Sequence, residues 1–147
     1  MDTWAWVAET PASWDDRKRQ VLGGLDPALF GLGRPESGDP LGDEWWRVED
    51  GAGRTLGYGR LDGSWGDAEI LVLVRPDARG GGVGAFVLAH LEAEAGRRRL
   101  HYIYNVVPHG HPDPEQVTEW LAGHGFVRND VGELRKQVPA GVVQNSG

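Results

Sequence analysis

The chain has 147 residues, of which 39% are hydrophobic and 25% charged, a composition typical of one globular domain. The net charge of −7 argues against nucleic acid or an anionic membrane surface as a general partner, and no apolar run approaches the roughly 18 residues of a membrane span. There is no cysteine, which excludes disulfides and thiolate catalysis. The first residues lack the basic and apolar regions of a secretory signal, so we expect a cytoplasmic protein.

The first third of the chain predicts a strand and two helices. Ser13 stands three residues before Asp16, a pattern typical of a helix N-terminus, and the glycines at 23–24 end the helical pattern. Turn-forming residues dominate the segment that follows the second helix. The predicted elements are a strand at 3–9, a helix at 13–22, a short helix at 27–32 and a loop at 33–43.

The middle of the chain predicts three strands and then a long helix. Residues 50–53 (Asp-Gly-Ala-Gly) form a hairpin signal, and residues 62–66 (Asp-Gly-Ser-Trp-Gly) form a second turn. Pro76 ends the third strand, because proline cannot donate a hydrogen bond to a sheet. The predicted elements are strands at 45–49 and 54–61, a strand that reaches Val74, and a helix at 83–97.

The last third predicts one strand, one helix and two further strands. Pro108 closes the strand, and the Asp-Pro-Glu sequence at 113–115 starts the helix. We expect residues 1–138 to form a single domain and 139–147 to be a disordered tail. The predicted elements are a strand at 100–107, a helix that ends before Gly123 or Gly125, and strands at 126–127 and 133–138.

Residues 70–84 carry the most functional information in the chain. An apolar strand at 70–74 leads into a run of glycines at 80–84, and an amphipathic helix begins at Val83. This arrangement binds phosphate, because glycines let the backbone approach an anion and the first N–H groups of the helix point outward. No Gly-Lys-Ser/Thr follows, which excludes the common P-loop, and the glycine spacing fits a dinucleotide fingerprint only in its relaxed form with alanine last.

The segment Arg79-Gly80-Gly81-Gly82-Val83-Gly84, preceded by Val74-x-Pro76, matches the pattern R/Q-x-x-G-x-G/A. It resembles the pyrophosphate-binding motif of the GNAT superfamily of N-acetyltransferases, and Gly125-Phe126 resembles a second sequence of that family. The resemblance covers residues 3–138. It implies an α+β fold of three layers with a mixed central sheet and the element order β-α-α-β-β-β-α-β-α-β-β.

The resemblance implies acetyl-CoA as co-substrate. In the family, the strand before the glycine loop separates from its neighbour, and the pantetheine arm pairs with the exposed backbone. The pyrophosphate would lie on the N–H groups of residues 80–85. The implied cofactor-binding residues are Val72, Leu73, Val74, Arg79, Gly80, Gly81, Gly82, Val83, Gly84 and Ala85.

The helix before Gly125 departs from the family pattern. Many members place an asparagine near its start and, seven residues later, a tyrosine that protonates the CoA thiolate. Counted back from Gly125, these positions hold Pro114 and Leu121. Trp120 is one place away, and its indole N–H is too weak an acid to replace a phenol. Thiolate protonation must therefore come from water or another residue, or the protein is not a standard catalyst.

Acetyl transfer needs a neutral amine, so a base or a chain of water molecules must take a proton from the acceptor. In several branches of the family the base is a glutamate on the strand that enters the glycine loop, at the position of Ala68 here. Glu69 is one residue out of register, which in a regular strand turns its side chain to the other face, although a bulge in this strand could restore it. We take Glu69 as the candidate base and Tyr104 as the candidate acid.

The acceptor site is predicted from Trp45, Trp46 and Asn105, because tryptophans in acidic surroundings suit an aromatic or cationic amine. The acceptor is expected to be a small-molecule amine or a peptide. His109 and His111 lie two residues apart in a loop, but no third ligand has supporting spacing, so we expect no metal site. Edge strands and tryptophans leave a homodimer open.

Three functions remain open from the sequence. The leading one is an N-acetyltransferase that moves an acetyl group from acetyl-CoA to a primary amine by direct transfer in a ternary complex, since a chain without cysteine cannot form a cysteine-acetyl intermediate. The second is a catalytically weak or inactive acyl-CoA-binding or regulatory protein of the same fold. The third is a small α+β protein with an unrelated glycine turn.

Overall fold

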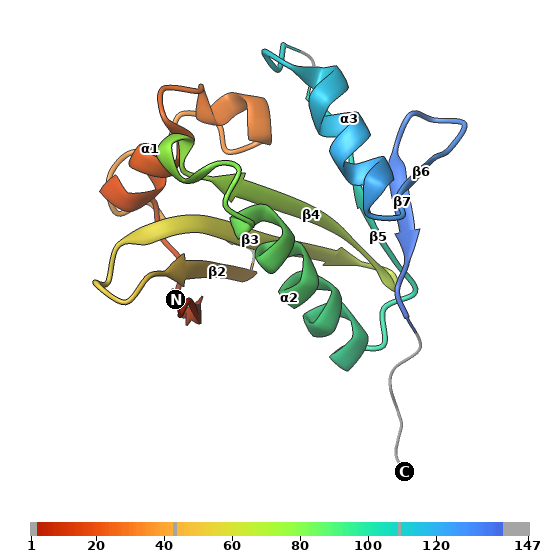
Figure 1. Cartoon of the computed structure of the whole chain (residues 1–147), viewed down its shortest axis with the longest axis horizontal. Coiled ribbons are helices and arrows are strands. Elements are labelled where there is room, and N and C mark those ends of the chain that lie inside the picture. Colours follow the sequence, from red (N-terminus) through yellow and green to blue (C-terminus); the bar gives the residue numbers. More distant parts are fainter. Residues whose placement is uncertain (1–2, 43, 109, 140–147) are drawn as a thin grey trace.

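The computed structural model describes residues 3–42, 44–108 and 110–139. It contains one seven-stranded sheet with helices on both faces (Figure 1). The elements are β1 (Ala5–Glu9), α1 (Asp16–Leu22), the 3₁₀ helix η1 (Pro27–Phe30), β2 (Glu44–Glu49), β3 (Thr55–Ser64), β4 (Asp67–Val74), the 3₁₀ helix η2 (Pro76–Ala78), α2 (Val83–Arg97), β5 (Tyr102–Asn105), α3 (Pro114–Gly123), β6 (Val127–Arg128) and β7 (Leu134–Gln137). The predicted α+β class and element order are confirmed.

The strands lie in the order β1-β2-β3-β4-β5-β7-β6. Neighbours are antiparallel except β4 and β5, which are parallel and joined through α2. A parallel pair needs a long crossover, and the apolar face of α2 provides it by packing on the sheet. The sheet is therefore mixed, with its only described parallel pair at the end of the glycine-rich crossover.

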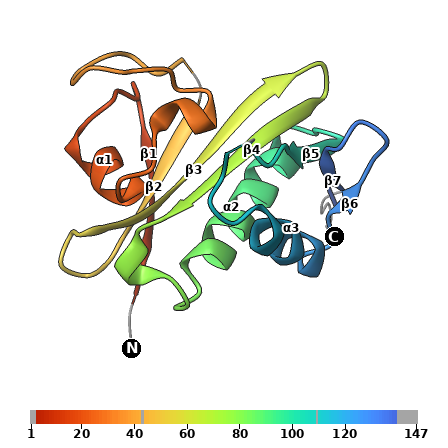
Figure 2. The same cartoon turned by 90° about the horizontal axis from the view of Figure 1, so that it is seen from above.

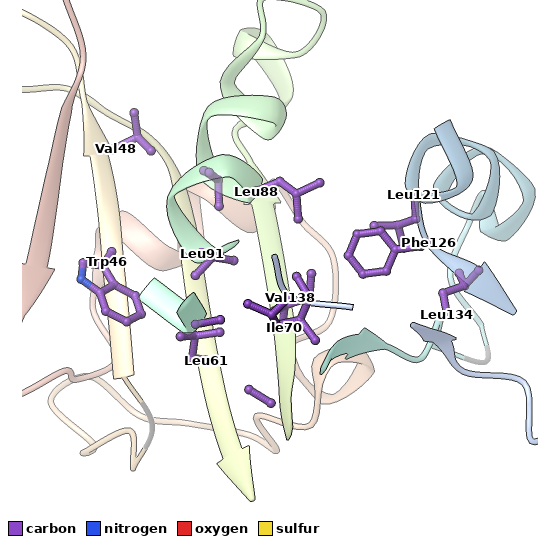
Figure 3. Packing of buried hydrophobic residues seen from close by; sticks show 14 of the residues in the cluster. Trp46, Val48, Leu61, Ile70, Leu88, Leu91, Leu121, Phe126, Leu134 and Val138 are labelled. Carbon is purple, nitrogen blue, oxygen red and sulfur yellow. The ribbon is translucent and has the colours of Figure 1, made fainter. Parts of the chain in front are cut away.

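The two faces of the sheet carry different helices. Figure 2 shows α1 on one side of β3 and β4, and α2 with α3 on the other. Side chains alternate along each strand, so Tyr58, Leu71 and Leu73 join the cluster under α1, whereas Leu61 and Ile70 join the cluster under α2. Figure 3 shows this second cluster, which includes Leu88 and Leu91 of α2 and Ile70 of β4.

Local boundaries differ from the prediction in several places, and β3 continues through Ser64 into the turn that was expected at 62–66. The cap of α1 is Asp15, whose Oδ1 accepts a hydrogen bond from the Lys18 N–H at 3.0 Å, whereas Ser13 forms an isolated bridge with Pro40. The short helix at 27–30 is a 3₁₀ turn, and β5 covers only four residues. Residues 140–147 lie outside the described part of the chain, so the predicted disordered tail and domain limit stay predictions. No helix of the described residues is long and apolar enough to cross a membrane.

Candidate functional site

The parallel strands β4 and β5 separate part-way along their length (Figure 1). They are paired only from Asp67 with Tyr102 to Glu69 with Tyr104, although β4 continues for five residues to Val74. No other described strand takes the place of β5 along this part of β4. The two strands therefore form a V that is closed at Glu69 and Tyr104 and opens toward the glycine loop.

The β4 backbone presents unpaired groups to this V. The Arg75 N–H donates to the Leu56 carbonyl at 2.8 Å, so by alternation the odd-numbered residues of β4 use their backbone groups toward β3. The N–H and C=O groups of Val72 and Val74 then point toward the V. Of the three residues predicted to bind through their backbone, Leu73 faces β3 and only Val72 and Val74 face the opening.

The glycine loop joins the open end of the V to α2. Gly80 and Gly82 have φ values of +81° and +91°, which favour glycine because L side chains rarely adopt them. Gly82 is the N-cap of α2 and supplies no capping side chain, and the first turn of α2 holds no acidic residue. The first N–H groups of α2, on Val83, Gly84 and Ala85, are therefore free to receive an anion. Arg79 is exposed at the start of this loop.

Acidic side chains gather at the closed end of the V, on the face of the sheet that carries α1. Asp62 of β3 pairs with Glu69 of β4, and Glu69 pairs with Tyr104 of β5, so the three side chains share one face. Arg135 of β7 pairs with Tyr104, and its guanidinium donates to Asp67 at 3.0 Å. This row (Asp62, Glu69, Tyr104 and Arg135) crosses four strands.

Tyr104 is half-buried in this row. Burial raises the pKa of its hydroxyl above the ordinary value, and the negative charges of Glu69 and Glu133 add to the effect. The phenol therefore remains protonated throughout the physiological range. A carboxylate and a protonated phenol on adjacent strands form a pair of a potential base and a potential acid.

Comparison with known families shows to which family the chain belongs. The sequence profile of the Acetyltransferase (GNAT) family matches residues 5–126. The chain belongs to the GNAT acetyltransferase family. The resemblance seen in the glycine loop is thereby confirmed over most of the chain. A search of curated proteins found no significant match.

Solved structures show the same GNAT fold. The ribosomal-protein-S18-alanine N-acetyltransferase of Escherichia coli is 12% identical, covers both chains completely and superposes with a TM-score of 0.64. The spermidine N-acetyltransferase of Vibrio cholerae, in complex with CoA and spermine, is 16% identical over 65% of this chain and 66% of its own, with a TM-score of 0.57. N-acetylglutamate synthase from Neisseria gonorrhoeae, complexed with coenzyme A and L-arginine, is 20% identical over 65% of this chain, with a TM-score of 0.56. This chain spans only 24% of that synthase.

Pro114 and Leu121, which stand where many GNAT members have asparagine and tyrosine, contribute to helix formation and to the core. Pro114 is the first residue of α3, whose cap is Asp113, and Leu121 is buried in the core cluster under α2. Trp120 contacts the start of α2: a Cβ on Gly84 would lie 3.1 Å from its ring. The absence of a side chain at Gly84 therefore allows α3 to approach the first turn of α2.

Glu69 keeps the orientation of a regular strand in this GNAT domain. The register between β3 and β4 runs from Gly57 with Val74 to Ser64 with Asp67 without a shift. No bulge therefore returns Glu69 to the face of Ala68, which is fully buried under α2. Asp62 is not predicted as a site residue, because the turn expected at 62–66 contains it. The observed two-residue turn at Trp65-Gly66 places it opposite Glu69 instead.

The residues predicted to bind the acceptor have other positions. Trp45 is 1% exposed in the cluster under α1, and Trp46 is 6% exposed on the opposite face, stacked on Trp6 at 5.5 Å. Buried rings offer no surface to an acceptor, and packing accounts for both. The Asn105 side-chain amide donates to the Ile70 carbonyl at 2.9 Å, inside the V and not on the acidic row.

Only one of the two loop histidines lies in the described part of the chain. His109 lies outside the described residues, and the ring of His111 accepts a hydrogen bond from the Asp113 N–H at 3.0 Å. Within residues 3–42, 44–108 and 110–139, no three histidine, aspartate or glutamate side chains gather around a common point.

Proposed function

We propose that this GNAT protein transfers an acetyl group from acetyl-CoA to a primary amine by direct transfer in a ternary complex. The observation that carries the proposal is the V itself. It joins an unpaired β4 backbone, an uncapped glycine-rich helix N-terminus and a carboxylate beside a phenol at its closed end. Acetyl-CoA supplies an activated thioester when it is bound.

The described residues fit acetyl-CoA along the length of the V. Amide groups of the pantetheine arm match the N–H and C=O groups that Val72 and Val74 direct into the opening. The pyrophosphate matches the free N–H groups of residues 83–85, and the positive end of the α2 dipole favours its charge. Arg79 forms no ion pair with any described residue, so its guanidinium is available to a phosphate. The thioester would then lie near Glu69 and Tyr104.

Glu69 is the base in this proposal. A protonated amine loses one proton to the Glu69 carboxylate, and its neutral nitrogen forms a bond to the acetyl carbon. As the bond from that carbon to sulfur breaks, the nitrogen loses its second proton to water and the amide is formed. The thiolate that leaves takes a proton from the Tyr104 hydroxyl or from water. Glu69 forms no ion pair with a described residue, so its charge is not already neutralised by a neighbouring cation.

The acidic row supports a cationic acceptor. Asp62, Glu69 and Glu133 all add negative potential at Tyr104, where the acceptor nitrogen would approach. A small-molecule amine or a peptide that carries positive charge would be attracted to this face. An acidic or neutral acceptor would gain nothing from it.

The second candidate is an acyl-CoA-binding protein without efficient chemistry. Leu121 and Pro114 support it, because they replace the side chains that many GNAT members use toward CoA. The two candidates differ in turnover but not in cofactor binding. The test is CoA release from acetyl-CoA with a panel of polyamines, amino acids and peptide N-termini, together with the acetyl-CoA dissociation constant.

For the enzyme, we expect Glu69→Gln to lower turnover by at least about a hundredfold and to change acetyl-CoA affinity less than twofold, because only proton removal is affected. Glu119→Gln, an exposed position on α3, is the matched control and should retain full turnover. Acetyl-CoA binding without CoA release for any amine would favour the second candidate instead.

We expect Tyr104→Phe to lower turnover by about tenfold at neutral pH, since water can still protonate the thiolate. A raised pKa keeps the hydroxyl protonated until the pH exceeds its ordinary value of about 10. Turnover of the unmodified enzyme should therefore decline only above about pH 10, and the Tyr104→Phe variant should lack that decline. A pH profile from 6 to 11 measures both effects, and equal profiles would remove Tyr104 from the mechanism.

A further inference from the structure

The point at which β4 and β5 separate is occupied by one side chain. Glu69 and Tyr104 are the last paired residues, and the Asn105 side-chain amide, immediately after Tyr104, donates to the Ile70 carbonyl at 2.9 Å. Asn105 is half-buried and ends β5. Its amide is therefore bound to the first backbone carbonyl of β4 that β5 leaves unpaired.

The hydrogen-bond pattern of a parallel ladder shows which backbone donor the Asn105 amide replaces. Each residue of β4 that faces β5 donates its N–H to one residue of β5 and accepts from the residue two places further on. Because Glu69 pairs with Tyr104, the Ile70 N–H donates to the Tyr104 carbonyl. In a continued ladder the Ile70 carbonyl would accept from the Val106 N–H. The Asn105 amide takes that acceptor instead.

The next step of the ladder is blocked by a proline. After Ile70, the next carbonyl of β4 that faces the V belongs to Val72, and its partner in a continued ladder would be the N–H of residue 108. Residue 108 is proline and has no N–H. β5 can therefore pair with neither of the two successive carbonyls of β4. The Asn105 amide occupies the Ile70 carbonyl in place of the Val106 N–H, and Pro108 has no N–H to donate to the Val72 carbonyl.

A distortion of β4 does not explain the separation. The register of β4 with β3 is regular along its whole length, without a bulge. A straight β4 could accept β5 beyond Glu69 as well as before it. The cause of the V must then lie in β5 and the residues that follow it.

We propose that Asn105 is a positioning residue, which ends the β4–β5 ladder and, together with Pro108, keeps the backbone of Val72 and Val74 available to the pantetheine arm. The inference has a cofactor part, that Val72 and Val74 stay available to the pantetheine arm, and this part rests on the proposed function. Its ladder part, that Asn105 and Pro108 end the β4–β5 pairing, concerns the protein without cofactor. Asn105 thus belongs to the architecture of the cofactor site rather than to the acceptor site.

The test is a double variant that lets the backbone N–H groups of residues 106 and 108 donate to β4. In Asn105→Val/Pro108→Ala the side-chain amide is removed and an N–H is supplied at position 108, so β5 can extend along β4. We expect the Val106 amide of the free protein to exchange with solvent at least about tenfold more slowly, and acetyl-CoA to bind at least about tenfold more weakly, which is the effect of about one hydrogen bond. Hydrogen exchange and titration calorimetry measure the two.

Asn129→Val is the matched control. Asn129 also forms side-chain hydrogen bonds, to Glu133 in the β6–β7 turn, but it lies outside the V. This control should leave Val106 exchange and acetyl-CoA affinity within about twofold of the unmodified protein. The same result for Asn105→Val/Pro108→Ala would overturn the inference. Failure of the unmodified protein to bind acetyl-CoA would overturn the proposed function and the cofactor part, while Val106 exchange would still decide the ladder part.

A second variant applies if the double variant does not fold. Asn105→Asp keeps the shape of the side chain, but an ionised carboxylate cannot donate to the Ile70 carbonyl and repels it. We expect the neighbouring Ile70 amide to exchange at least about tenfold faster than in the unmodified protein. An unchanged Ile70 exchange rate would show that Asn105 does not hold the end of the ladder.

Discussion

The two faces of the sheet are built in different ways. The face under α2 is an apolar core whose outer boundary is the V, and its candidate binding groups are backbone N–H and C=O groups. The face under α1 buries charge: the Lys18 ammonium is 1% exposed and lies 2.6 Å from Glu9, over the ring of Tyr58 at 4.7 Å. Next to the closed end of the V, this face also carries the row of Asp62, Glu69, Tyr104 and Arg135. In the proposed function, backbone groups bind the cofactor, and the acceptor reacts beside side chains brought together from four strands.

This difference has a consequence for substitutions. A site made of backbone groups tolerates changes of side chain and fails when the chain path changes. A site made of charged side chains fails when one partner is removed, because a buried charge then remains uncompensated. Substitutions can therefore distinguish the two faces. On the α1 face they should change the free energy of unfolding, and at the V they should change the affinity for the cofactor.

The largest expected effect is on the α1 face. We expect Lys18→Met to lower the free energy of unfolding by about 3 kcal/mol, since Glu9 remains buried and Arg47, at 3.3 Å, is its only remaining ion-pair partner among the described residues. Arg19→Met removes an ion pair of the same 2.6 Å length in the same helix, but on the surface, and should lower it by less than about 1 kcal/mol. Urea unfolding of both variants measures the difference, and equal values would contradict the contrast between the faces.

The next effect concerns the V. Valine at position 82 cannot adopt a φ of +91° without strain, so Gly82→Val should move the first N–H groups of α2. We expect acetyl-CoA to bind about a hundredfold more weakly, which corresponds to two charge-assisted hydrogen bonds of about 1.5 kcal/mol each. Gly132→Val introduces the same kind of strain at a φ of +85° in the β6–β7 turn. If both variants bind acetyl-CoA equally well, the glycine loop does not hold the phosphates.

The smallest effect is a dependence on pH. Tyr58 is fully buried, and its hydroxyl has no hydrogen-bond partner among the described residues. Burial, with a further contribution from Glu9, raises its pKa well above the ordinary value of about 10. Above about pH 10 the unfolded chain loses this proton and the folded chain keeps it, so the free energy of unfolding falls by up to about 1.4 kcal/mol per pH unit. Tyr58→Phe should remove that slope and change stability at pH 7 by less than about 1 kcal/mol. Tyr102→Phe, at an exposed position, should keep the slope.

Local sequence determined much of the fold and of the cofactor site. Turn residues and apolar periods are short-range signals, so the element order and the glycine loop at 80–84 could be predicted. The cap of α1 was misplaced because Ser13 and Asp15 are both good caps, and the bridge between Ser13 and Pro40 is not visible in the sequence.

The acceptor face depends on long-range pairing that the sequence does not display. The neighbours of Glu69 come from β3 and β5, and a shift of one or two residues in a hairpin changes them. Tryptophan is equally suited to cores and to binding sites, so the burial of Trp45 and Trp46 could not be read from their identity. Asn105 was found as a candidate, but its partner, the carbonyl of Ile70, is a backbone group that no side-chain pattern indicates.

The proposed function requires that acetyl-CoA binds in the V through backbone groups of β4 and the start of α2. Hydrogen exchange of the unmodified protein, with and without saturating acetyl-CoA, tests it most directly. We expect slower exchange at the amides of Val72, Val74 and residues 83–85, with little change under α1. Protection confined to other segments, or no protection at acetyl-CoA concentrations that saturate binding, would contradict it.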